Sequence, residues 1–161
     1  MAGAPVEIRA LVKGLQKCSP IFILGDDLMG GRGASFSGNS GYKLRDLSGS
    51  VKQIKYAKDI IEGSYKYIES AKKYEQRQME VYHKTYPGGA GEKRHRERLR
   101  ILDNMPMILT AMANKSGKAG TVIESKERVF NSHAIDERLR HYYEHPEVYH
   151  KILKEARKYR K

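Results

Sequence analysis

Apolar residues recur with helical spacing over most of the chain after residue 50. Between Ser50 and Tyr82 they fall every three or four positions, with lysines between them, and they are Ile54, Ala57, Ile61, Tyr65, Ile68 and Ala71. This spacing puts them on one face and predicts one long helix. Ser48 or Ser50 can cap its start, and the Pro-Gly-Gly sequence at 87–89 ends it.

A second helix is predicted to begin near Glu92 and to run through Asn104. Pro106 disfavours helical angles at Met105, the residue before it. The stretch 107–115 is therefore either a kinked continuation of this helix or a new short one.

The C-terminal part is predicted to be a helical hairpin. Gly117 and Gly120 break the preceding pattern, and the β-like run 121–125 (TVIES) follows. Ser132 can cap the first helix of the hairpin, and Pro146 suits the first turn of the second. Their apolar positions are Ile135, Leu139 and Tyr142 in the first and Val148, Ile152, Ala156 and Tyr159 in the second.

The N-terminal part has a different pattern. Residues 5–16 match a short helix, and the apolar run 21–24 (IFIL) matches a short strand or an anchor. Residues 25–50 are rich in Gly and Ser and have too few apolar residues to fold unaided. We therefore expect an N-terminal segment, 1–49, and a basic helical domain, 50–161. The expected fold is mainly α, with one long helix, a C-terminal helical hairpin and at most a minor short β element.

The charge of the chain indicates that this helical domain is a binding protein. The chain has 31 Lys and Arg against 19 Asp and Glu, a net charge of +12, and residues 92–161 hold 17 of the bases and 10 of the acids. Such an excess attracts polyanions. No apolar stretch is long enough to span a membrane, so no membrane partner is predicted. The single Cys18 cannot form an internal disulfide, which favours the reducing cytoplasm.

Two dense basic clusters are the predicted nucleic-acid contacts. They consist of Lys93, Arg94, Arg96, Arg98 and Arg100, and of Lys154, Arg157, Lys158, Arg160 and Lys161. Arginine forks bind phosphates, and the interleaved tyrosines can stack on bases. The alternative interpretation is an ordinary solvated helix surface with tyrosines filling a small core.

The glycine-rich loop 33–40 (GASFSGNS) has part of the spacing of a phosphate-binding loop. Asn39 stands where the required lysine belongs, and Asp26 and Asp27 come between the preceding apolar run and the loop. We therefore predict no nucleotide and no other cofactor, and interpret the segment as a flexible or partner-ordered loop.

Two further patterns suggest metal chemistry. His141, Glu144 and His145 match the spelling H-x-x-E-H, in which two histidines hold zinc and the glutamate is the base, but Pro146 ends regular helix there. Solvated or capping histidines are the simpler interpretation, and no metal is predicted.

The second pattern consists of Asp103 with Glu124 and Lys126, the latter two alternating along a possible strand. It matches the D…E-x-K set of metal-dependent nucleases, in which carboxylates hold magnesium and lysine positions water. A surface turn explains the same residues.

Two phrases resemble proteins of phages and mobile elements of Gram-positive bacteria. Residues 29–41 (MGGRGASFSGNSG) resemble the start of phage morphogenesis-region proteins, which makes Met29 a candidate start. Residues 47–60 (LSGSVKQIKYAKDI) are similar to a phrase L-x-G-S-x-K-Q-I-x-W-A-x-x-I of uncharacterised relatives, with Tyr56 in place of the tryptophan.

The resemblance implies a small phage-type protein acting in the host bacterial cytoplasm. The first hypothesis is a non-catalytic protein that binds nucleic acid or a ribonucleoprotein. The second is an inhibitor of a host defence nuclease complex, similar to anti-CRISPR proteins, or an assembly factor that docks on a large protein partner. The third is a small metal-dependent nuclease. A net charge of +12 argues against DNA mimicry.

Overall fold

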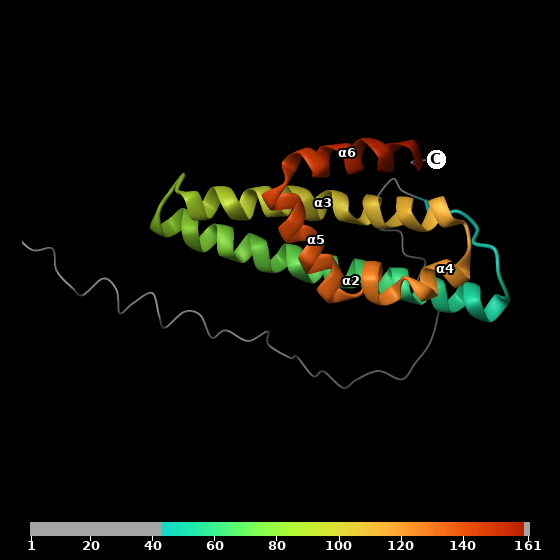
Figure 1. Ribbon diagram of the computed structural model, residues 1–161. Helices are drawn as coiled ribbons and strands as arrows, with labels where there is room; N and C mark the ends of the chain where they lie inside the picture. The colour runs from blue at the N-terminus through green and yellow to red at the C-terminus, as the bar shows by residue number, and fades with distance from the viewer. Residues whose placement is uncertain (1–42, 160–161) are drawn as a thin grey trace, which may run out of the picture. The chain divides into compact units, whose positions relative to one another are not determined.

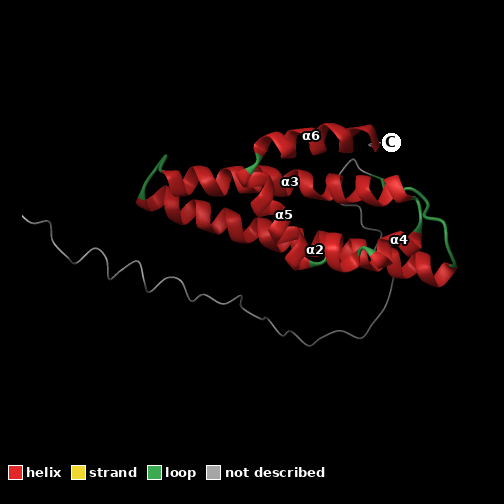
Figure 2. Ribbon diagram, in the orientation of Figure 1, coloured by secondary structure: helices red, strands yellow, loops and turns green. Residues whose placement is uncertain are grey.

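A computed structural model describes residues 43–159, and in that range the chain is helical without a named strand (Figure 2). The predictions for 5–16, 21–24 and 33–40 fall outside the described residues. The helices are α2 (Val51–Thr85), α3 (Ala90–Ser116), α4 (Ala119–Glu124), α5 (Ser132–Glu144) and α6 (Pro146–Ala156), with a π-helical turn η1 (Lys126–Phe130) and a 3-10 turn η2 (Arg157–Tyr159). The mainly α prediction is confirmed.

The predicted long helix is α2, and its start is built as a capping box. Ser50 Oγ accepts the Gln53 N–H at 3.3 Å, and Gln53 Oε1 accepts the Ser50 N–H at 3.0 Å. Two of the otherwise free N–H groups at a helix start are satisfied in this way. Gly49 precedes the cap with a φ of 150°, where a side chain is strained, and an added Cβ would lie 3.2 Å from Ala119 Cβ.

The second helix, α3, continues through Pro106 to Ser116, so 107–115 is a continuation and not a new helix. Proline costs the helix one hydrogen bond and disfavours helix at the preceding residue. The neighbouring side chains Met105, Met107, Ile108 and Leu109 are almost completely buried. Burial of these residues offsets the cost, because unwinding the helix here would expose the centre of the core.

The β-like run 121–125 is not a strand. Residues 121–124 belong to α4, and Val122 is buried in the core. The nearest feature to a sheet in the described range is one isolated parallel bridge between Ser48 and Lys118. Packing against α2 therefore overrides the β preference of Val and Ile here.

The core lies between α2 and α3, which run side by side, while α5 crosses both of them and α6 lies along α3 (Figure 1). The first helix of the predicted C-terminal pair is capped by Asn131, whose Oδ1 accepts the Ala134 N–H at 2.7 Å, and not by Ser132. Pro146 opens α6 as predicted. The predicted apolar positions Ile135, Leu139 and Tyr142 are buried.

Two helical glycines give opposite predictions for the same substitution. A Cβ on Gly91 in α3 would overlap the Tyr82 ring, whereas Gly63 in α2 has no atom within 4 Å of that position. Alanine is a better helix former than glycine, so Gly63→Ala should stabilise the protein by about 0.5–1 kcal/mol. Gly91→Ala should destabilise it by about 1–3 kcal/mol because the ring must move. Urea unfolding of both variants measures this, and stabilisation by Gly91→Ala would show that Tyr82 is not held in place.

Candidate nucleic-acid interface

The predicted cluster 93–100 lies on the first turns of α3, but only part of its charge is free. Lys93 and Arg94 are exposed and make no ion pair with any described residue. Arg96 pairs with Glu92, and Arg100 Nη1 lies 2.6 Å from Glu97 Oε1. The density of cations in the sequence therefore overstates the positive charge that this helix offers to a ligand.

Arg98 is part of a buried network and not a surface contact. Its Nε donates to Glu75 Oε1 at 2.7 Å, and Glu75, on α2, is only 2% exposed. The other carboxylate oxygen of Glu75 lies 2.5 Å from Nδ1 of His95, which is also buried. The Tyr82 ring stacks on His95 with centroids 5.3 Å apart. These contacts join α2 to α3, because a buried carboxylate requires a partner.

A second glutamate, Glu92, stabilises the turn between the same two helices through hydrogen bonds. Its Oε2 accepts the Gly88 N–H at 2.7 Å and lies 3.1 Å from His83 Nδ1. The Gly88 hydrogen bond, followed by the one to His83, lowers the pKa of Glu92 below its usual value of 4.5. The carboxylate therefore stays charged and engaged within the hairpin.

The described residues of the C-terminal cluster lie on α6 and η2, which pack against α3. Tyr149, near the start of α6, bonds the Asn104 side chain at 3.0 Å and the Arg100 carbonyl at 3.3 Å. From there α6 runs towards the C-terminal end of α3, away from 93–100 (Figure 1).

Lys154 and Arg157 are exposed there without an ion pair to a described residue. Lys158 Nζ lies 3.8 Å from Glu155 Oε1, and Arg160 and Lys161 fall outside the described range. The structure therefore does not merge the two predicted clusters into one surface.

Glu124 and Lys126 do not lie on a strand, although the comparison with metal-dependent nucleases required one. Glu124 ends α4, and Lys126 begins the π-helical turn. Asp103 lies on α3 and pairs with Lys72 at 3.0 Å. Burial lowers the pKa of Lys72, but its bonds and charge interactions with Asp103 and Glu69 outweigh this and raise it.

The two histidines of the H-x-x-E-H pattern lie close together. The rings of His141 and His145 have centroids 4.7 Å apart, and His145 Nδ1 is 3.5 Å from Glu147 Oε1. Within residues 43–159 no group of three or more His, Cys, Asp or Glu is placed to hold a metal ion. His145 is the residue at which α5 ends and α6 begins, which fits a capping position.

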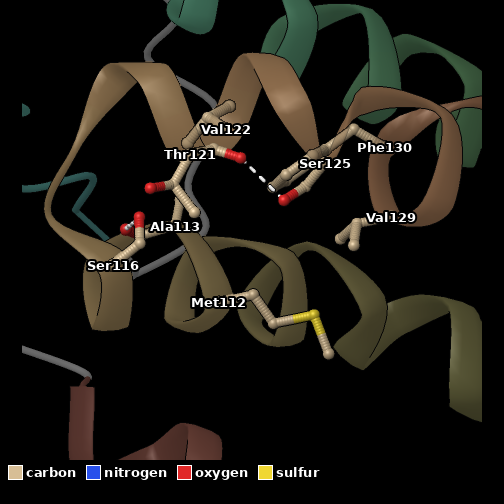
Figure 3. Close-up of a pocket in the computed structure, with 8 residues that line it drawn as sticks. All are labelled: Met112, Ala113, Ser116, Thr121, Val122, Ser125, Val129 and Phe130. Atoms are coloured by element: carbon tan, nitrogen blue, oxygen red, sulfur yellow. Dashed lines mark hydrogen bonds between the residues drawn. The ribbon is translucent and has the colours of Figure 1, made fainter.

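A small cleft lies where α3, α4 and η1 meet (Figure 3). About 230 Å³ of empty space lies within it, and this volume includes open solvent. Its lining is made of Met112, Ala113, Ser116, Thr121, Val122, Ser125, Val129 and Phe130, and the Ser125 hydroxyl donates to the Thr121 carbonyl at 2.6 Å. None of these side chains is a carboxylate, His, Cys or Lys, so the lining supplies no general acid or base.

Comparisons with protein-family models, with curated proteins and with solved structures give no match for the chain. The resemblance to phage and mobile-element proteins therefore stays a prediction. Its first phrase, up to residue 41, falls outside the described range, and its second, 47–60, covers the capping box and the first part of α2. No helix within 43–159 has both the length and the apolar character to cross a bilayer.

The network around Glu75 generates a stability prediction. Glu75→Gln keeps the volume but leaves Arg98 without its counter-charge, and breaking a buried pair in this way costs about 3–5 kcal/mol. Glu97→Gln removes the exposed partner of Arg100 and should cost less than about 1 kcal/mol. Chemical denaturation of both variants at neutral pH measures the two costs. Equal losses would contradict the structural role of Glu75.

Proposed function

We propose that the protein binds nucleic acid or a ribonucleoprotein through exposed cations, without chemistry of its own, in the cytoplasm of a host bacterial cell. One observation carries the proposal: in a chain of net charge +12, most Lys and Arg side chains of residues 43–159 pair with no described carboxylate. In the described range carboxylates pair with six Lys and Arg side chains, which are Lys66, Lys72, Arg96, Arg98, Arg100 and Lys158. The remaining Lys and Arg side chains of that range make no ion pair with another described residue, and most are exposed.

Unpaired cations matter because phosphate binding is driven by the release of counterions from the nucleic acid. An arginine already paired with glutamate must lose that partner before it binds phosphate, so its net contribution is smaller. Among the described members of the two predicted clusters, the cations without an ion pair are Lys93 and Arg94 on α3 and Lys154 and Arg157 near the C-terminus. They support salt-sensitive binding with little dependence on base sequence.

Binding to labelled single-stranded and duplex oligonucleotides across a salt series tests the proposal. The logarithm of the affinity should fall linearly with the logarithm of salt concentration, with a slope of about −0.7 per phosphate contact for single strands and −0.9 for duplex. Several contacts would make the affinity fall by at least tenfold between roughly 50 and 200 mM salt. An affinity that is undetectable at low salt, or that does not respond to salt, would contradict it.

A second candidate, action through protein contacts, is favoured by exposed apolar side chains on the outer half of α2. Tyr74 is 59% exposed and Val81 56%, and their spacing of two helical turns places them on the same face. Tyr86, just beyond the helix, is also exposed. Such a surface suits the inhibitor or assembly-factor hypothesis, in which a large protein partner covers it.

Capture from host lysate with and without nuclease treatment distinguishes these functions. The tagged protein should lose its bound material after nuclease treatment if nucleic acid holds the complex together. A protein retained after treatment, and released by Tyr74→Ser with Val81→Ser, would favour the second candidate. Gln76→Ser, an exposed and uncharged change on another face of α2, is the matched control.

A further inference from the structure

Segments distant in sequence meet at the end of the bundle where α2 begins and α3 ends. The buried Asn114 side chain binds the incoming chain at two points: its Oδ1 accepts the Arg45 N–H at 2.9 Å, and its Nδ2 donates to the Lys43 carbonyl at 3.2 Å. Residues 43–45 are thereby fixed against the last turns of α3.

A second set of bonds adds the chain between α3 and α4. The Ser48 N–H donates to the Gly117 carbonyl and the Ala119 N–H to the Ser48 carbonyl, both at 2.9 Å. The Ser48 hydroxyl also donates to the Gly117 carbonyl at 3.0 Å. Lys118, between the two bonded residues, is therefore held beside Ser48, and α2 begins three residues further on.

These segments carry cations that the fold leaves uncompensated. Lys43, Arg45, Lys52, Lys115 and Lys118, named here the cationic end, are all exposed and make no ion pair with a described residue. Asp46 is the one acidic residue in 43–52 and 114–118. The first turn of α2 contains no acidic residue, so the positive end of the helix dipole adds to the same field. The cluster 93–100 differs, since Arg96, Arg98 and Arg100 are paired there.

We infer that the cationic end is the main phosphate-binding surface of the protein and that its ligand is single-stranded nucleic acid. The inference rests on the proposed function and locates its site. Tyr56, one turn beyond Lys52, is 46% exposed and stands between Lys55 and Lys58. An exposed aromatic ring beside phosphate-binding cations offers a stacking surface for an unpaired base, which a duplex does not present.

The backbone hydrogen bonds pre-order this surface, which lowers the entropic cost of binding compared with a flexible basic segment. Asn114 and the Ser48–Lys118 bridge fix the backbone positions of cations from the incoming chain and from the α3–α4 connection before any ligand binds. Less conformational entropy is then lost on binding than with a flexible segment.

Matched charge variants of the full chain test the inference by fluorescence anisotropy with labelled oligothymidylate. Lys52→Gln, Lys115→Gln and Lys118→Gln together remove three unpaired charges from the cationic end. The control Lys66→Gln, Arg96→Gln and Arg100→Gln removes three exposed but paired charges. The first variant should lose affinity on the order of tenfold or more and reduce the salt slope by about 2, and the control should lose less than about threefold. Circular dichroism checks that both variants fold.

The possible outcomes separate the inference from the proposed function. Equal losses in the two variants would overturn the location of the site while leaving nucleic-acid binding intact. No binding by the unmodified protein would overturn both. Binding of polyglutamate but not of oligothymidylate, lost in the cationic-end variant, would identify an acidic protein as the ligand and overturn the nucleic-acid assignment.

Tyr56→Ala tests the preference for single strands. It should weaken binding to oligothymidylate by roughly fivefold or more and leave duplex binding nearly unchanged. Tyr143→Ala, an exposed tyrosine on α5, is the control. An equal effect of Tyr56→Ala on both ligands would overturn the single-strand assignment.

Discussion

The α2–α3 hairpin depends on the buried carboxylate of Glu75. A charge placed between two helices is tolerated only with partners close by, and α3 supplies them in Arg98 and His95. Their bonds join α3 to α2 in the outer half of the hairpin, where few other groups are buried. The same requirement turns Arg98 of a strongly basic helix towards Glu75, so this member of the predicted binding cluster contributes to stability instead.

The two ends of the hairpin consequently differ in their electrostatics. At the turn, Glu75 and Glu92 engage two arginines and two histidines. At the other end, backbone bonds and the neutral Asn114 side chain hold the chain together, and the surrounding cations have no counter-charge. An external polyanion would meet unpaired cations at both ends, but at the turn several arginines already have a carboxylate partner.

Sequence periodicity was sufficient for α2, its Ser50 cap and the two C-terminal helices, because their signals are local. It was insufficient where distant packing decides the outcome. Helix persists through Pro106 because the residues around it are buried, and 121–124 is helical because Val122 packs in the core. The pairing of Arg98 was also invisible, since its partner Glu75 lies far from it along the chain. The cationic end requires residues separated by most of α2 and α3, so no sequence window contains it.

The π-helical turn η1 fixes the path of the chain between α4 and the Asn131 cap of α5. Its bond from the Asn131 N–H to the Lys126 carbonyl spans one residue more than an α-helical bond, so the turn acts as a one-residue insertion. It brings the Phe130 carbonyl to the Ser64 hydroxyl at 2.5 Å. A chain shorter by one residue here would remove this bond and shift Phe130, whose side chain is buried in the core, relative to Ser64. The length of this turn is therefore as tightly constrained as the identity of a core residue.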